Sequence, residues 1–452
     1  MLVLDVGKTH SKLTLVNLEG QAPVVRSRAN CAALHNGVAA LDTAGVEAWL
    51  LETISDLSDL AHIAAVVPVA HGAAAALVKG DRLMAPVLDY EASPPAGLVG
   101  LYDAERDPFE CTLSPRLPGG LNLGVQLAWH EHLGRTLSDS QAVVLTWPQY
   151  WAFRLSGERA SEITSLGCHT DLWRPFEGRY SDLARASGWD ERFAPIRQAG
   201  EVLGAVRAEV AEAVGLAPDC QVLCGLHDSN ASLLGARAQT EVSEEPFCLV
   251  STGTWFVAMQ SGGDGPPRLD ESRDTLGNVD VVGRVTPSAR FMGGREFAAI
   301  AGDSAVAVSA AEAIRLIDRD VATTGTFTPG CGPFPRSKGA IVGELRTDGE
   351  RAALASLHLA LMTDTSLSLI AAKGPIVIEG RFAADPVFSA ALAALRPRTP
   401  VLRLDGVDGV ALGAARLWAP DLEPRAPATP VAPLTADLTA YAKRWLDRIA
   451  RA

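Results

Sequence analysis

Leu2-Val-Leu-Asp-Val-Gly-Lys-Thr-His-Ser-Lys-Leu13 opens the chain, and its alternation of apolar and polar residues decides the fold. The alternation runs on both sides of Gly7, which predicts two β-strands joined by a tight turn. The Gly-Lys-Thr triplet also suggests a P-loop, but that motif requires a glycine five residues before Gly7, where the chain has Leu2. A P-loop also requires a helix after the threonine, whereas this sequence continues as a strand. We therefore predict a β-hairpin.

The predicted turn is rich in groups that bind phosphate. Gly7 lets a ligand approach the backbone closely. Hydroxyl groups or cations come from four neighbours: Lys8, Thr9, Ser11 and Lys12. Asp5 ends the first strand and is placed to orient Mg²⁺ through water. This composition predicts a site for the β- and γ-phosphates of a nucleotide, with an ordinary surface hairpin as the alternative.

A second informative segment is Cys224-Gly-Leu-His-Asp-Ser-Asn-Ala231, which follows the apolar strand Gln221–Cys224. Small residues continue beyond it, as in a tightly packed helix. Asp228 is therefore predicted at a strand-to-helix junction, a common position for catalytic groups in α/β folds. A carboxylate there can align a substrate hydroxyl and take its proton, which contributes on the order of 10²–10⁴-fold. The alternatives are a helix N-cap for Asp228 and a core position for His227.

Two segments in the second half of the chain repeat the strand-and-turn pattern. Val250-Ser-Thr-Gly-Thr-Trp255 ends in a glycine turn with hydroxyl groups, and Pro375–Phe382 combines an apolar strand with another glycine turn. The turn residues are candidates for binding a nucleotide: Gly253, Thr254, Gly380 and Arg381. Since both halves contain a strand followed by a glycine turn, the chain shows a coarse two-fold echo.

The length of 452 residues exceeds a single core and predicts two domains. Strand-like and helical stretches alternate, which predicts an α/β layer fold. The polar stretch Ala238–Pro246 is the candidate boundary, so we expect domains at 1–242 and 243–452. Gly409–Arg416 is predicted as a helix of small residues, which core packing and a flat slot for adenine explain equally well. A final amphipathic helix is predicted at Leu434–Ala450.

The composition excludes several classes of protein. A net charge of −13 argues against a nucleic-acid partner, because such proteins need a basic face. An acidic protein still binds ATP, because the phosphates meet local donors and Mg²⁺. No apolar run approaches the ~18 residues that cross a bilayer, and the first residues show no signal-peptide pattern. Seven cysteines at irregular spacings are typical of reduced thiols. We expect a cytoplasmic protein without a membrane partner, and a homodimer is one candidate assembly.

In this order the segments resemble the FGGY carbohydrate kinases of the actin-like ATPase superfamily, over nearly the whole chain. The first phosphate motif of that family is matched by Asp5, Gly7, Thr9, Ser11 and Lys12. Its catalytic-aspartate motif is matched by Gly225 and Asp228, and its second phosphate motif by Ser251–Trp255. Its adenosine region is matched by Gly380 and Leu412–Ala415. The resemblance implies two ribonuclease-H-like domains with the active site in the cleft between them. It also implies transfer of the γ-phosphoryl group of Mg-ATP to a sugar hydroxyl, with Asp228 as general base and Asp5 and Asp228 near the Mg²⁺ ion.

Two details of the resemblance indicate a branch of the family. His227-Asp228-Ser229 is similar to the His-Asp-Thr of rhamnulokinases, and Val69-Ala-His71-Gly72 falls where that branch has a sugar-contacting glycine. The resemblance implies a ketose substrate, such as L-rhamnulose or L-fuculose. The residues expected to bind the sugar are His71, Gly72, Glu91, His227 and Ser229.

Three departures from the family pattern leave the substrate open. Arg381 follows Gly380 where the family has consecutive glycines, so Arg381 stacks on adenine or the loop accepts another nucleotide. Tyr90-Glu91 replaces an aromatic-Asp pair, and Phe291–Glu296 stands where rhamnulokinases carry a sugar-contacting Asn. The alternatives to a sugar kinase are a non-catalytic sensor that binds nucleotide or sugar, and a kinase of a polyol or non-sugar metabolite.

Overall fold

The computed structural model of the chain describes residues 1–135, 137, 141–239, 246–263, 268–302, 306–405, 408–423 and 427–451. The chain forms two compact units. Unit 1 comprises Met1–Ala238, Gly277–Val285 and Gly409–Arg425, and unit 2 comprises Gln239–Leu276, Thr286–Asp408 and Ala426–Ala452. The predicted boundary between residues 242 and 243 lies outside the described residues, and two segments that follow it belong to unit 1.

Unit 1 is built on a seven-stranded sheet with the order β14-β15-β6-β1-β2-β3, in which β16 also pairs with β6. Its strands are β1 (Leu2–Val6), β2 (His10–Leu15), β3 (Val24–Ala29), β6 (Ala65–Ala70), β14 (Val202–Ala205), β15 (Gln221–Leu223) and β16 (Leu226–His227). Strands β1 and β2 are antiparallel and joined at Gly7–Thr9, which confirms the predicted hairpin. Strands β15 and β16 both run parallel to β6, which runs parallel to β1.

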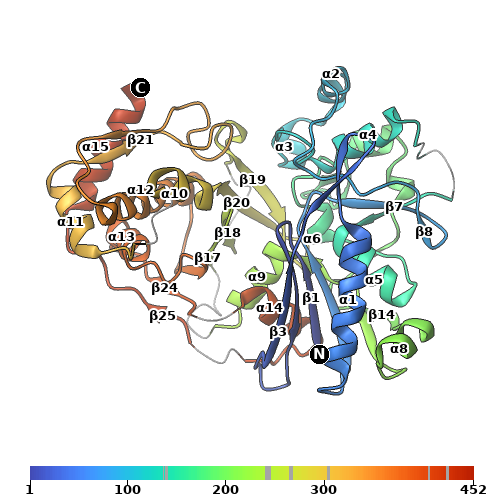
Figure 1. Cartoon of the computed structure of the whole chain (residues 1–452). Coiled ribbons are helices and arrows are strands. Elements are labelled where there is room, and N and C mark those ends of the chain that lie inside the picture. The colour runs from blue at the N-terminus through green and yellow to red at the C-terminus, as the bar shows by residue number, and fades with distance from the viewer. Residues whose placement is uncertain are drawn as a thin grey trace. The chain divides into compact units, whose positions relative to one another are not determined.

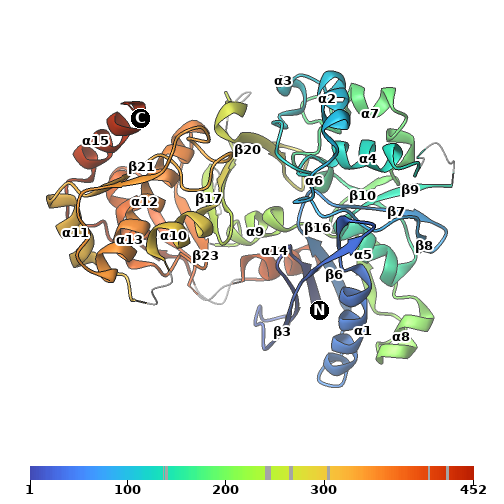
Figure 2. The same cartoon turned by 45° about the horizontal axis from the view of Figure 1, so that its top comes forward.

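Helices cover the sheet of unit 1 because both of its faces are apolar. Every residue of β6 is buried, as expected for a parallel central strand. One face packs with α1 (Thr43–Ser58) and α5 (Trp147–Ser156) into a single hydrophobic core. In Figures 1 and 2, α9 (Asp228–Ala236) and α14 (Gly409–Trp418) lie on the other side of this sheet.

Helices α9 and α14 touch backbone to backbone. A Cβ atom on Gly413 would lie 1.8 Å from the carbonyl oxygen of Ala231, and one on Gly235 would lie 2.3 Å from that of Gly409. Only glycine fits at these two positions, so the small residues predicted for both helices serve to pack the helices on each other. This packing anchors the helix that begins with Asp228.

Smaller elements complete unit 1 around this sheet. They are β4 (Ala32–His35), β5 (Val38–Leu41), β7 (Ala75–Lys79), β8 (Arg82–Leu83), α2 (Ala96–Glu105), α3 (Phe109–Thr112), α4 (Leu123–His132), β9 (Val143–Thr146), β10 (Ser161–Glu162), α6 (Ile163–Leu166), β11 (Trp173–Arg174), β12 (Arg179–Tyr180), α7 (Asp182–Ala186), η1 (Asp190–Arg192), β13 (Ile196–Arg197) and α8 (Ala208–Val214).

Unit 2 holds most of a second seven-stranded sheet, with the order β19-β20-β18-β17-β23-β24-β25, in which part of β19 belongs to the unit 1 segment Gly277–Val285. Its strands are β17 (Phe247–Thr252), β18 (Phe256–Ser261), β19 (Thr275–Val279), β20 (Val285–Phe291), β23 (Ile376–Gly380), β24 (Val401–Arg403) and β25 (Thr429–Pro430). Strand β17 pairs antiparallel with β18 and parallel with β23, as β1 pairs with β2 and β6. The order β24-β23-β17-β18-β20 therefore repeats β15-β6-β1-β2-β3, which confirms the two-fold echo.

The helices of unit 2 pack around the long, largely buried α12 (Asp348–Leu369). The others are η3 (Glu271–Arg273), α10 (Gly293–Ala301), α11 (Ala310–Asp318), α13 (Pro386–Leu395) and α15 (Leu438–Arg451), with the short strands β21 (Ala322–Thr324) and β22 (Ala340–Val342). The last helix begins at Leu438 and not at the predicted Leu434, because the Leu434 N–H donates to Ala390 O of α13 instead of joining the last helix. Among the residues described, no helix has the length and apolarity that crossing a membrane requires.

Candidate functional site

Three predicted segments of unit 1 meet at one edge of its sheet. Val6 of β1 and His227 of β16 both lie beside Ala70 of β6 in parallel register. The chain therefore leaves the sheet in the same row at Gly7, His71 and Asp228. The carboxyl ends of parallel strands are where ligands bind in α/β sheets. Sequence analysis identified each segment separately, and the sheet brings them together.

The hairpin turn is held from the side by Asn30, which follows β3. Asn30 Nδ2 donates to Gly7 O at 2.8 Å, and the Asn30 N–H donates to Thr9 O at 2.8 Å. The hydroxyl of Ser11 is buried and donates to Asn30 Oδ1 at 3.0 Å. Of the two hydroxyls predicted for phosphate, the one on Thr9 is thus at the surface, and the one on Ser11 stabilises the turn. The sequence alone does not indicate this role of Asn30, because its partners lie on the hairpin of β1 and β2.

Lys8, predicted to bind phosphate, forms an ion pair with Asp89. The Asp89 carboxylate is only 3% exposed, and its Oδ1 accepts a hydrogen bond from the Glu91 N–H at 2.9 Å. The Lys8 ammonium also lies 4.9 Å from the centre of the Tyr90 ring, at cation–π distance. Tyr90 and Glu91 are notable in the sequence because they replace a family pair, whereas nothing there marks the aspartate before them. Glu91 itself is exposed.

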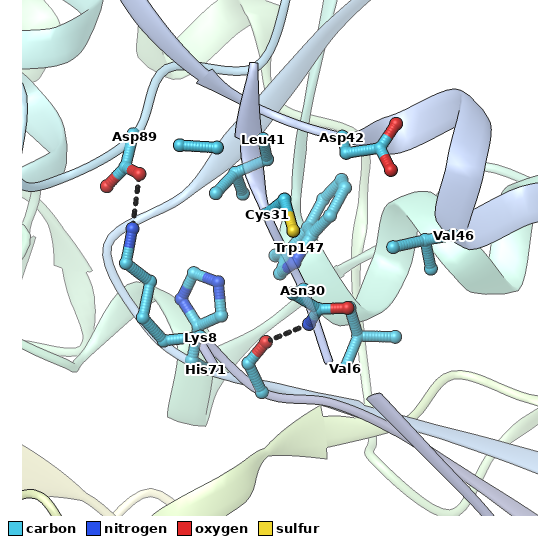
Figure 3. A pocket seen from close by; sticks show the side chains of 12 residues that line it. Val6, Lys8, Asn30, Cys31, Leu41, Asp42, Val46, His71, Asp89 and Trp147 are labelled. Carbon is cyan, nitrogen blue, oxygen red and sulfur yellow. Dashed lines mark hydrogen bonds and ion pairs between the residues drawn. The ribbon is translucent and has the colours of Figure 1, made fainter. Parts of the chain in front are cut away.

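A hollow beside the hairpin turn is shown in Figure 3. Its empty volume, including space open to solvent, is about 300 Å³. The polar groups that line it include Lys8, Asn30, His71 and Asp89, and Trp147 forms part of its apolar wall. Burial lowers the pKa of His71, so its imidazole is neutral at pH 7. The ring donates from Nδ1 to Gly72 O at 2.7 Å.

Asp228 is the first residue of α9, and its carboxylate is held on one side. Oδ1 accepts a hydrogen bond from the Ser229 N–H at 2.6 Å and lies 3.3 Å from Ser229 Oγ and 3.1 Å from His227 Nε2. Within the described part of the chain, Oδ2 accepts no hydrogen bond, and the side chain is 30% exposed. The N-cap position belongs to His227, so Asp228 is not the cap of this helix. One oxygen of Asp228 is thus fixed and the other is available.

His227 and Gly72 are packed against each other beneath Asp228. A Cβ atom on Gly72 would lie 2.8 Å from Cys168 Sγ and 3.1 Å from His227 Nε2. Burial lowers the pKa of His227 and keeps its imidazole neutral at pH 7. Gly72 is therefore required by its neighbours, whether or not it also contacts a ligand.

A buried carboxyl group supports this region from below. Glu162 Oε2 accepts hydrogen bonds from Thr164 Oγ1 at 2.6 Å and from the backbone N–H groups of Thr164 and Ser165. Thr164 Oγ1 in turn accepts a hydrogen bond from the His227 N–H at 3.1 Å. Burial raises the pKa of Glu162 to about 7. The sequence alone does not predict this pair, since nothing local distinguishes a buried Glu-x-Thr from an exposed one.

Unit 2 joins the other predicted turns in a similar way. Thr252 and Gly380 are neighbours in parallel register, so the turns after β17 and β23 lie side by side. The Arg381 N–H donates to Thr252 O at 2.9 Å. Gly380 has a φ of 83°, and a Cβ atom there would lie 2.2 Å from Thr252 O, so glycine is required. The four predicted nucleotide-binding residues of these turns share one edge of the unit 2 sheet: Gly253, Thr254, Gly380 and Arg381.

Trp255, at the end of the first of these turns, covers a buried ion pair. The Arg290 guanidinium lies 4.7 Å from the Trp255 ring centre, and its Nε donates to Asp274 Oδ1 at 2.9 Å. Asp274 Oδ2 accepts the Gly332 N–H at 3.0 Å. Glu296, in the segment where the resemblance leads one to expect a sugar-contacting residue, is buried and accepts the backbone N–H groups of residues 327 and 328. Its role in unit 2 is to hold that loop.

The carboxylates of the described residues do not form a resident metal centre. No group of three or more His, Cys, Asp or Glu side chains among them is arranged to hold a metal ion. Asp5 lies opposite Lys12 in the hairpin register, one residue before the row that contains Val6. All seven cysteines are free thiols, and five of them are buried.

Comparison with known proteins gives three consistent similarities. A family model described as the C-terminal domain of FGGY carbohydrate kinases matches residues 244–426. An L-fuculokinase of Salmonella typhi is 25% identical over 285 residues, which are 58% of this chain and 57% of that protein. The chain thus matches little more than half the length of the curated relatives.

Solved structures match along the whole chain. A carbohydrate kinase from Novosphingobium aromaticivorans is 41% identical, with a TM-score of 0.91, covering 99% of this chain and 100% of that one. A xylulose kinase from Lactobacillus acidophilus has a TM-score of 0.80 at 16% identity, covering 100% of this chain and 97% of that one, and so shares the fold. The α/β fold predicted from the sequence is confirmed by these matches.

Proposed function

Because the chain belongs to the FGGY carbohydrate kinase family, we propose that it transfers the γ-phosphoryl group of Mg-ATP to a hydroxyl group of a small ketose. One observation carries this proposal. Asp228 presents a free carboxylate oxygen at the sheet edge that also carries the glycine turn of the first hairpin. Phosphoryl transfer requires a base near the acceptor hydroxyl and donors for the phosphates, and both are predicted at this edge.

Asp228 would act through Oδ2. That oxygen accepts a hydrogen bond from the sugar hydroxyl, aligns it, and takes its proton as the new oxygen–phosphorus bond forms. Oδ1 stays hydrogen-bonded to the Ser229 N–H during this step, so the carboxylate does not have to reorient. A positioned base of this kind contributes on the order of 10²–10⁴-fold to the rate.

The donor set fits an Mg²⁺ ion that arrives with the nucleotide. Mg²⁺ takes one or two carboxylates and completes its shell with water and substrate phosphates, and the absence of a larger acidic cluster among the described residues agrees with this. Asp5 and Asp228 are the carboxylates that would hold the ion. When bound, it neutralises charge on the phosphoryl oxygens.

The nucleotide would be bound by backbone and side-chain donors of the glycine turns. In unit 1 these are the N–H groups around Gly7 and the cations Lys8 and Lys12. In unit 2 they are the turn of Gly253 and Thr254, with Gly380 leaving room for a base and Arg381 able to stack on it. Each turn is fixed by hydrogen bonds to a neighbouring segment, which spares the cost of ordering it on binding.

The sugar would lie near His71, Gly72, Glu91 and Ser229. The matched relative from Salmonella typhi is named an L-fuculokinase, which makes L-fuculose the first ketose to test and L-rhamnulose the second. The opposite charges of Lys8 and Asp89 compensate each other beside His71. An uncharged sugar suits such a neutral pair.

The test is a coupled assay of ADP release by the purified protein with Mg-ATP and a panel of ketoses, aldoses and polyols. A strong responder among the ketoses supports the proposal and names the substrate. A responder among the polyols only would replace the sugar with a polyol. Nucleotide and sugar binding by calorimetry without turnover on any member would indicate a sensor and contradict the kinase.

A further inference from the structure

We infer that Gln149 is a positioning residue, whose buried amide holds a β-bulge at Leu223–Gly225 and thereby places Asp228 in the row of the candidate site. This role rests on the proposed function, in which Asp228 is the base. Gln149 lies on α5, 75 residues before Cys224 of the bulge, and nothing in the sequence connects the two.

The strand that leads to Asp228 contains one residue more than its neighbour in the sheet. Val222 of β15 lies beside Val66 of β6, and Leu226 of β16 lies beside Val69. Between these pairs, three residues of the first strand therefore face two residues of the second, which is a β-bulge. Bulges occur frequently next to active sites, where they change the direction of a side chain.

The residues on both strands fit this bulge. Gly225 has a φ of 79°, and a Cβ atom on it would lie 2.0 Å from Pro68 O, so glycine is required. Pro68 lies on the opposite strand, inside β6, which is buried along its whole length. Proline has no N–H for the ladder and occurs in sheets at edges or at bulges, so its position opposite the bulge agrees with this geometry.

The bulge decides which residue follows the strand in the row of His71. In the observed register, His227 lies beside Ala70, so the residue after it stands in that row. This residue is Asp228. If the register of β15 continued without a bulge, Leu226 would lie beside Ala70 and Asp228 would stand one residue beyond the row. One residue of a strand spans about 3.3 Å, whereas a misplacement of about 1 Å can cost on the order of 10²-fold in rate.

Gln149 pairs the carbonyl groups of the bulge. Its Nε2 donates to Cys224 O and to Gly225 O, each at 3.1 Å. Carbonyl oxygens only accept hydrogen bonds, so these two contacts require the nitrogen of the amide and use both of its protons. The amide oxygen accepts the hydroxyl of Thr146, which fixes the same orientation. Gln149 is 0% exposed, so bulk water does not reach these contacts.

The N–H groups of the same two residues are paired with the chain that precedes β14. The Cys224 N–H donates to Glu201 O at 2.9 Å, and the Gly225 N–H donates to Ala199 O at 3.0 Å. The backbone polar groups of the bulge are thus bonded on both sides. Without the side-chain amide, two buried carbonyl groups would lose their donor, and a buried group without a partner bears its full desolvation cost. The backbone would then shift to find new partners, and it carries Asp228 with it.

Two buried glutamines separate positioning from stability. Gln149→Leu removes the amide and keeps a side chain of similar size. We expect its kcat to fall at least about 10-fold, with the KM values for ATP and for the sugar changed less than about 3-fold. The sugar in this assay is the ketose that the wild type turns over best.

The matched control is Gln260→Leu in β18. The buried amide of Gln260 also donates to backbone carbonyls, those of Phe247 at 3.0 Å and Ser261 at 2.8 Å, at the end of the unit 2 sheet away from its glycine turns. This variant should lower the urea midpoint about as much as Gln149→Leu does and keep kcat within about 2-fold of wild type. Equal loss of kcat in both variants, or no loss in Gln149→Leu, would overturn the inference.

Thr146→Val provides the kinetic test if Gln149→Leu does not fold. It removes only the hydroxyl that orients the Gln149 amide and keeps the shape of the side chain. We expect a loss in kcat of about 2- to 10-fold with unchanged KM values. An unchanged kcat in this variant would then overturn the inference.

A second measurement does not depend on catalysis. Hydrogen exchange, followed by mass spectrometry on the full-length proteins, reports on the amide groups of residues 224–229. In Gln149→Leu they should exchange at least about 10-fold faster than in wild type, and in Gln260→Leu at the wild-type rate. Unchanged exchange in Gln149→Leu would overturn the inference, because the amide would not hold the bulge. If the wild type phosphorylates no sugar, the proposed function fails, while the exchange rates still decide whether Gln149 holds this segment.

Discussion

The ammonium group of Lys8 is bound to the carboxylate of Asp89, 81 residues further along the chain. Lys8 lies in the hairpin turn predicted to hold phosphate, and Asp89 is almost fully buried beside His71. The opposite charges of Lys8 and Asp89 lie where the hairpin turn meets the lining of the hollow in Figure 3. Lys8, which the sequence predicts to bind phosphate, therefore also takes part in the packing of unit 1.

Removing Lys8 should destabilise unit 1 because it leaves a buried charge without a partner. We expect Lys8→Met to lower the free energy of unfolding by about 1–3 kcal/mol. The double variant Lys8→Met/Asp89→Asn should recover much of that loss, because neither charge remains. Urea denaturation of the four proteins measures the coupling. Additive effects of the two changes would show that the ion pair contributes nothing.

Replacing Asp228 should abolish turnover and spare nucleotide binding. Asp228→Asn keeps the shape of the side chain but removes the base, so we expect kcat to fall at least about 10²-fold. The dissociation constant of ADP, measured by calorimetry, should change less than about 3-fold. The matched control is Asp219→Asn, at an exposed loop position of the same unit. Retention of more than about a tenth of kcat would exclude Asp228 as the base.

The buried carboxyl group of Glu162 should make stability depend on pH. Its pKa rises from an ordinary value of 4.5 to about 7 on folding, so the folded state binds the proton more tightly than the unfolded state. The resulting stabilisation is complete below pH 4.5 and is lost as the pH rises through about 7.

Glu162→Gln cannot ionise and should escape this loss. Relative to wild type, its free energy of unfolding should improve by more than about 1 kcal/mol between pH 5 and pH 8, since one pKa unit corresponds to about 1.4 kcal/mol. Urea denaturation at four pH values checks the trend. The exposed control Glu212→Gln should show no such trend, and a parallel pair of curves for Glu162→Gln would contradict the prediction.

Gly413→Ala should disrupt the contact between α9 and α14. The new Cβ atom would lie 1.8 Å from Ala231 O, and backbone atoms cannot give way cheaply. We expect a loss of at least about 1–3 kcal/mol in unfolding free energy, as for an overpacked core. Gly97→Ala in α2, where an added Cβ atom meets nothing within 4 Å, is the control. It should be neutral or stabilising by up to about 1 kcal/mol, because alanine favours a helix.

The backbone of this protein was predictable where the signal is local. The hairpin around Gly7 follows from alternation within a dozen residues, and the junction before Asp228 follows from an apolar strand and the small residues after it. The small-residue patterns of α9 and α14 were also visible, but nothing in them showed that the two helices pack on each other. The start of the last helix was predicted four residues early, because a tertiary hydrogen bond at Leu434 leaves no trace in the periodicity.

The residues that support the candidate site were not predictable, because their partners lie far away in the sequence. Asn30 acts on a turn some twenty residues before it, and Asp89 acts on Lys8 across 81 residues. Glu162 is linked to His227 only because the fold brings Thr164 of α6 against β16. Each is an ordinary polar residue until the register of the sheet is known. Periodicity identifies strands and helices, but it carries no information about which of them are neighbours.

The glycine contact between α9 and α14 also sets the order in which unit 1 can be completed during synthesis. Helix α9 ends at Ala236 and α14 begins only at Gly409, with nearly all of unit 2 encoded between them. At about 5–20 residues per second, a ribosome needs on the order of ten seconds or more to make the intervening chain. Throughout that interval the helix that starts with Asp228 lacks its packing partner. Asp228 is therefore synthesised early, but its helix is packed only after α14 has been made. Translation that stops before residue 409 would leave unit 1 incompletely packed, although nearly all of its sequence has been made.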